Sequence, residues 1–101
     1  MRYLGALRGA GTLFGEIEPL GRVDYEFDGY LVRPGEVVAS GEVRMHADAL
    51  ASAFARQDLS LKTDDGRTLR IRFSGKRQRT ASDYAHADVH GGLPDAKDWA
   101  R

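Results

Sequence analysis

The chain has 101 residues, no cysteine, and 15 basic residues balanced by 15 acidic ones. This length matches a single domain, here residues 1–101, with one modest core. The lack of cysteine excludes disulfides, thiolate zinc sites and cysteine nucleophiles, and the balanced charge excludes a strong overall field toward polyanions or membranes. The N-terminus has no uninterrupted apolar run, so we expect a cytoplasmic protein without a signal peptide or membrane anchor.

Glycines divide the first half of the chain into short segments with the alternating pattern of β-strands. A first hairpin is predicted from Tyr3–Arg8 and Thr12–Ile17, with its turn at Gly9–Gly11. A long strand follows, because apolar residues alternate with acidic ones over residues 23–28.

The apolar phase of this long strand shifts at Asp28–Gly29, and two structures explain the shift. A tight turn at this dipeptide would pair Phe27 with Tyr30. Alternatively, a bulge interrupts one long strand, and the turn comes later, at Pro34–Gly35. The bulge is favoured, because the strand after that later turn then presents Val43 to Phe27.

The alanine-rich segment Asp48–Arg56 is the best candidate for a helix. Leu50 and Phe54 lie four residues apart and therefore on one helix face, and Asp48 is suited to cap the N-terminus. The apolar stripe is narrow, so we expect the helix to cover one end or an open edge of a sheet.

Residues 59–73, LSLKTDDGRTLRIRF, predict a β-hairpin whose register follows from its hydrophobic pattern. A two-residue turn at Asp65–Gly66 would set leucines opposite arginines. A three-residue loop, Asp64–Gly66, instead pairs Leu61 with Leu69 and leaves one apolar face. The face turned to solvent is then basic.

The basic residues of this solvent face and of the loop after it form what we term the basic strip. A row of arginine and lysine is suited to bind an anionic ligand, and it also occurs as a solvated face that prevents edge pairing. No aromatic residue is predicted beside the strip, so nucleic acid is not favoured as the ligand. The basic strip comprises Lys62, Arg70, Arg72, Lys76, Arg77 and Arg79.

A closing strand is predicted at Tyr84–Val89, and this segment with His90 contains the one pattern that resembles a metal-ligand set. In an extended chain, His86, Asp88 and His90 project from one face at steps of roughly 6.6 Å. Two imidazoles and a carboxylate suit a divalent metal. The competing interpretation is a solvent-facing strand surface, in which case no cofactor is expected.

The polar tail, residues 94–101, is expected to dock on the body through Trp99, because exposing so large an apolar ring gains nothing. The whole pattern predicts a small antiparallel β-barrel or barrel-like sandwich of about six to eight strands with one short α-helix. The predicted core comprises Leu4, Leu13, Ile17, Val23, Tyr25, Phe27, Val43, Leu50, Phe54, Leu59, Leu61, Leu69, Ile71, Phe73 and Val89.

The sequence contains neither a nucleophile elbow nor a phosphate loop in its required context. We therefore expect a non-catalytic binding module, either a monomer or an edge-paired homodimer, that recognises an anionic ligand or a protein partner at a sheet edge. A metal-binding protein or metal-dependent enzyme built on His86, Asp88 and His90 is the alternative.

Overall fold

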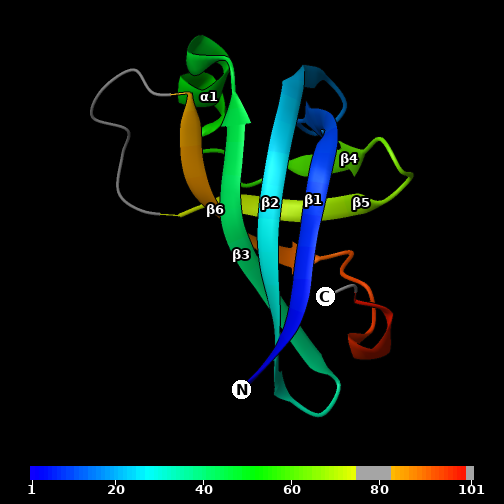
Figure 1. Cartoon of the computed structure of the whole chain (residues 1–101). Coiled ribbons are helices and arrows are strands. Elements are labelled where there is room, and N and C mark those ends of the chain that lie inside the picture. Colours follow the sequence, from blue (N-terminus) through cyan, green and yellow to red (C-terminus); the bar gives the residue numbers. More distant parts are fainter. Residues whose placement is uncertain (75–82, 100–101) are drawn as a thin grey trace.

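A computed structural model describes residues 1–74 and 83–99, in which six strands form a closed antiparallel barrel (Figure 1). Around the barrel the strands follow the order β1-β2-β3-β6-β5-β4, and β4 pairs with β1 to close it. The predicted fold class is confirmed. The elements are β1 (Arg2–Phe14), β2 (Pro19–Arg33), β3 (Glu36–Met45), α1 (Ala47–Ala53), β4 (Ser60–Thr63), β5 (Thr68–Phe73), β6 (Tyr84–Gly91) and the 3-10 helix η1 (Ala96–Asp98).

The long strands β1 to β3 form one side of the barrel, and β4 and β5 cross behind them (Figure 1). Apolar side chains point inward along the strands, and Leu13, Phe27, Val43 and Leu61 are fully buried. This alternation gives the sheet one apolar face toward the core and one polar face toward water. No helix in residues 1–74 or 83–99 is long and apolar enough to span a membrane.

The first predicted hairpin is wrong, because β1 runs unbroken through its glycine-rich middle. The glycines lie where neighbouring atoms approach the strand closely. A Cβ atom on Gly9 would lie 3.1 Å from the Tyr25 hydroxyl, and one on Gly11 would lie 2.4 Å from the Lys62 carbonyl oxygen. The chain reverses only after β1 ends, which leaves Ile17, a predicted core residue, 89% exposed.

Strand β2 continues through Asp28–Gly29 and turns at Pro34–Gly35, so the tight turn at the first dipeptide is wrong. The irregularity in the β2–β3 pairing lies at Val32, close to the turn, and not near Asp28–Gly29. Because the irregularity lies near the turn, the register between β2 and β3 differs from the predicted one. Val43 pairs with Tyr25, two residues away from its predicted partner.

The β4–β5 hairpin has the predicted register. Leu61 pairs with Leu69, and the Thr63 amide donates a hydrogen bond of 2.8 Å to the Arg67 carbonyl. Gly66 has a φ angle of +96°, which suits the glycine of a three-residue loop. Local patterning therefore set the pairing of these two strands.

Helix α1 is shorter than predicted, and its N-cap is His46 instead of Asp48. The His46 Nδ1 atom accepts a hydrogen bond of 3.3 Å from the Asp48 amide. Leu50 is buried, and just beyond the helix the Phe54 ring stacks on Phe73 with a centroid distance of 5.8 Å. The helix covers one end of the barrel (Figure 1).

Residues 94–99 lie toward the end of the barrel opposite α1 (Figure 1). Trp99 packs there against Gly29. Trp99 is 8% exposed, and its Nε1 donates a hydrogen bond of 3.1 Å to the Pro94 carbonyl. A Cβ atom on Gly29 would lie 2.4 Å from the indole ring. The ring thus fills the space that a side chain at position 29 would need.

Replacing the indole should therefore relieve the constraint at position 29. Trp99→Ala is expected to lower the free energy of unfolding by about 3 kcal/mol, because a large buried ring is lost. Gly29→Ala is expected to destabilise the parent protein but to be nearly neutral beside Trp99→Ala, since its methyl group then has room. Urea denaturation of the parent, both single variants and the double variant measures this coupling.

Gly41→Ala is the matched control. A Cβ atom there would lie 1.9 Å from the Glu26 carbonyl oxygen, a contact that does not involve Trp99. This substitution is expected to destabilise both backgrounds equally. If Gly29→Ala also lowers the free energy of unfolding by the same amount with and without the indole, the proposed contact between Gly29 and Trp99 is wrong.

Candidate functional site

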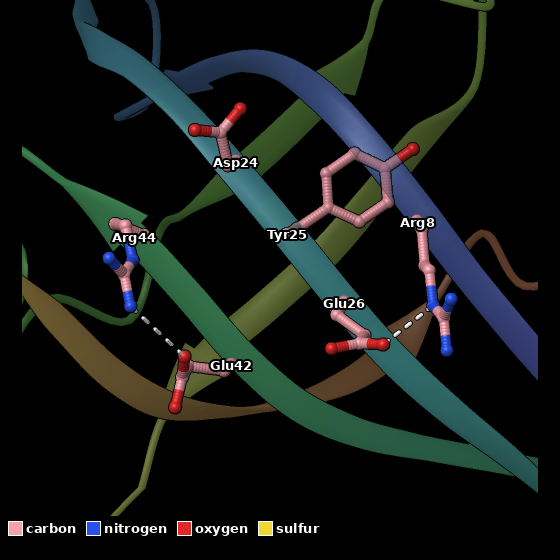
Figure 2. A pocket seen from close by; sticks show the side chains of 6 residues that line it. All are labelled: Arg8, Asp24, Tyr25, Glu26, Glu42 and Arg44. Carbon is pink, nitrogen blue, oxygen red and sulfur yellow. Dashed lines mark ion pairs between the residues drawn. The ribbon is translucent and has the colours of Figure 1, made fainter.

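A pocket of about 260 Å³ on the outer face of β1 to β3 is lined mainly by charged residues (Figure 2). The Arg8 guanidinium lies 2.6 Å from the Glu26 carboxylate, and that of Arg44 lies 3.9 Å from Glu42. Both arginines at this pocket are therefore neutralised by carboxylates beside them. The lining residues are Arg8, Asp24, Tyr25, Glu26, Glu42 and Arg44.

The Tyr25 ring extends from β2 toward β1 (Figure 2). It stacks on Phe27 with a centroid distance of 5.5 Å. Burial raises the pKa of the Tyr25 hydroxyl, the Asp65 carboxylate adds to this effect, and a hydrogen bond with Thr63 opposes it. A buried hydroxyl with a raised pKa keeps its proton at neutral pH, which suits a packing role better than acid–base catalysis.

The described residues of the predicted basic strip lie on the other side of the barrel, along the outer face of β4 and β5 (Figure 1). Lys62, Arg70 and Arg72 are all exposed there, and the partly buried Arg67 adjoins them at the hairpin turn. The structure thus brings the described members of the strip together on one surface. The remaining predicted members lie outside the described residues: Lys76, Arg77 and Arg79.

Arg70 and Arg72 of the strip differ from most of the other described arginines, which form ion pairs with carboxylates. Among the described residues, no carboxylate oxygen lies within 4.0 Å of Arg70 or Arg72, although Asp88 is the register partner of Arg72. An anion arriving at this face would meet charges that the protein has not neutralised. Among the described arginines, those that form ion pairs are Arg8, Arg22, Arg33, Arg44 and Arg56.

Phe14 lies beside the strip, and sequence reasoning missed it. Phe14 of β1 is opposite Ser60 of β4, which is in turn opposite Arg70 of β5. Its ring is partly exposed, and the Lys62 ammonium lies 4.8 Å from the ring centroid in a cation–π contact. The pairing of β1 with β4 creates this neighbourhood, and no local sequence pattern specifies that long-range pairing.

Arg22 and Asp64 mark the end of the strip at the β4–β5 turn. The Arg22 guanidinium donates hydrogen bonds of 2.8 and 2.6 Å to the Asp64 carboxylate, and a third of 3.1 Å to the Thr12 hydroxyl. This bidentate contact holds the pKa of Asp64 below its ordinary value. Because Arg22 offsets its charge, Asp64 repels an anion at neighbouring Lys62 less strongly.

His86, Asp88 and His90 are all exposed and alternate with buried residues along β6. The His86 Nδ1 atom is hydrogen-bonded to the Ser74 hydroxyl, and Asp88 lies opposite Arg72. In the part of the chain that the structure describes, no three histidine, cysteine, aspartate or glutamate side chains are grouped so as to hold a metal ion. The three residues therefore share a strand face without forming a ligand cluster.

Comparison with known proteins gives no match. No family model matches the chain, and neither a curated protein nor a solved structure does so. Functional inference therefore rests on the residues of the chain itself.

Removing the Arg22 guanidinium should change the titration of Asp64. In the parent protein the lowered pKa means that the ion pair stabilises the fold above the ordinary carboxyl pKa. This contribution declines as the pH falls through the lowered value. Arg22→Gln is expected to return the pKa of Asp64 toward its ordinary range, which NMR titration of the Asp64 carboxyl carbon would detect.

Asp58 provides an internal reference in the same spectra, because its carboxylate, whose pKa is also lowered, pairs with Arg56 and not with Arg22. Its titration is expected to be identical in the two proteins. An Asp64 titration that does not respond to Arg22→Gln would contradict the role assigned to the bidentate contact.

Proposed function

We propose that the protein is a non-catalytic binding module that holds an anionic ligand on the outer face of β4 and β5. The observation that carries this proposal is the row of exposed cations, Lys62, Arg70 and Arg72, which have no carboxylate partner within the described residues. Clustered positive charges raise the local electrostatic potential and attract anions. An anion bound there does not have to displace an internal carboxylate.

The spacing of these cations suits a ligand with several negative charges. Arg70 and Arg72 are alternate residues of one strand, so their Cα atoms are about 6.8 Å apart, or two steps of ~3.4 Å. Lys62 stands on the neighbouring strand, opposite Thr68. Guanidinium groups bind phosphate through two parallel hydrogen bonds, which favours phosphate-bearing ligands over simple halides.

The rest of the described surface supports binding over catalysis. The charged pocket on the outer face of β1 to β3 pairs both of its arginines, and Tyr25 holds its proton in a buried position. We place the module in the cytoplasm, as the sequence predicts, where phosphate-bearing polymers are abundant.

Reversing both strip arginines tests the proposal. The double variant Arg70→Glu, Arg72→Glu is expected to bind inorganic polyphosphate about tenfold more weakly or worse, because two attractive charges become repulsive. Isothermal titration calorimetry at low and moderate salt gives the affinities, and that of the parent protein is expected to fall as salt rises. Circular dichroism checks that the variant keeps its β-sheet.

Arg2 and Lys97 provide the matched control, since both are exposed and have no ion pair with a described residue. Arg2→Glu, Lys97→Glu changes the net charge of the protein by the same amount at positions off the strip. Polyphosphate affinity is expected to stay within about twofold of the parent value. Equal losses in the two double variants would attribute binding to net charge alone and contradict the proposal.

A further inference from the structure

On the outer face of β1, β4 and β5, an aromatic ring and cations lie in two neighbouring rows of residues that are paired across the three strands. The first row runs from Phe14 through Ser60 to Arg70. In the second row, Lys62 places its ammonium over the Phe14 ring, 4.8 Å from the centroid. A partly exposed apolar platform therefore lies within the same surface as unpaired positive charges. The second row consists of Thr12, Lys62 and Thr68.

We propose that this surface binds single-stranded nucleic acid, an inference that rests on the anion-binding function proposed above. One base stacks on Phe14, and three phosphates near it contact Lys62, Arg70 and Arg72, one phosphate to each cation. Every base has a π face and every nucleotide carries a phosphate, so this combination recognises a strand without reading its sequence. Stacking moves the Lys62 ammonium from the ring to the adjacent phosphate.

The ring distinguishes nucleic acid from other polyanions. Polyphosphate and phospholipid head groups would use the cations alone and would leave Phe14 without a partner. A flat aromatic base instead buries the exposed part of the ring and gains stacking energy in addition to the phosphate contacts. Ser60 and Thr68 place hydroxyl groups between the cations, where they can hydrogen-bond to sugar or phosphate oxygens.

The dimensions of the surface favour a single strand over a duplex. Strand β4 has 4 residues and β5 has 6. At about 3.3 Å per residue, the face extends roughly 13 to 20 Å, enough for a few nucleotides. In a duplex the bases stack on one another, so their faces are not available to Phe14.

Carboxylates limit the surface at its borders. Asp64 and Asp65 lie at the β4–β5 turn, where Arg22 offsets the charge of Asp64. Asp88 lies across from Arg72 on β6. These charges repel phosphates beyond Lys62, Arg70 and Arg72, which confines binding to a short segment of the strand.

The test compares a short oligothymidine with an abasic strand of the same length, which has the same phosphates but no bases. The parent protein is expected to bind oligothymidine about tenfold more tightly than the abasic strand, the order of magnitude for one stacked base. Fluorescence anisotropy with end-labelled strands at low salt measures both affinities. This comparison needs no variant, so it remains decisive even if a substitution impairs folding.

Phe14→Leu tests the platform itself, because leucine keeps an apolar side chain but has no aromatic face. Its affinity for oligothymidine is expected to fall about tenfold, while its affinities for the abasic strand and for polyphosphate stay at the parent values. Tyr3→Leu is the matched control, because Tyr3 is also a partly exposed aromatic of β1 but contacts Tyr30 and not the strip. It is expected to leave all affinities unchanged.

Salt dependence counts the phosphate contacts. Three contacts predict that log K for oligothymidine falls with log salt concentration with a slope of about −2, since each contact to a single strand contributes about −0.7. A slope near zero would overturn the assignment of three phosphates to the strip.

The other possible outcomes of these binding experiments distinguish the nucleic-acid inference from the anion-binding proposal. Equal affinity for oligothymidine and the abasic strand, with no effect of Phe14→Leu, would overturn the nucleic-acid inference and leave the anion-binding function in place. No binding of polyphosphate or of either strand would overturn both. Binding of polyglutamate as tight as that of oligothymidine would also overturn the nucleic-acid inference and assign the surface to an acidic protein partner.

Discussion

The pairing of β1 with β4 is the contact on which the rest of the molecule depends. Only residues 11–14 of β1 take part, yet they join the start of the chain to the hairpin that carries the basic strip and thereby close the barrel. Gly11 permits the close approach, because a side chain there would collide with the Lys62 backbone. The same pairing places Phe14 beside Lys62. The contact that closes the barrel therefore also assembles the candidate site.

The charges of the barrel are distributed in two ways, although the chain as a whole is neutral. On the outer face of β1 to β3, Arg8 is paired with Glu26 across two strands, and Arg44 is paired with Glu42 along β3, as expected for a solvated sheet face. On β4 and β5, Arg70 and Arg72 lack such partners among the described residues. Exposed arginines are easily neutralised within a sheet, so leaving these two unpaired is more consistent with an external anion than with folding alone.

Local patterns predicted the parts of the structure that depend on neighbours in sequence. The pairing of Leu61 with Leu69 follows from alternation and one glycine. Sequence reasoning failed where distant segments decide the outcome: it assigned a turn to the middle of β1, because glycines that accommodate Tyr25 and β4 resemble turn glycines. For the same reason it placed Ile17 in the core and left Phe14 out of the site. Which strand closes against β1 is a tertiary property that no single segment encodes.

The most direct test of the central claim is an amide NMR titration of the labelled protein with oligothymidine, because it reports binding and location together. We expect saturable shifts concentrated in β4, β5 and at Phe14, which diminish as salt is raised. Shifts concentrated instead around the pocket of Arg8 and Arg44, or a spectrum that does not change, would contradict the central claim.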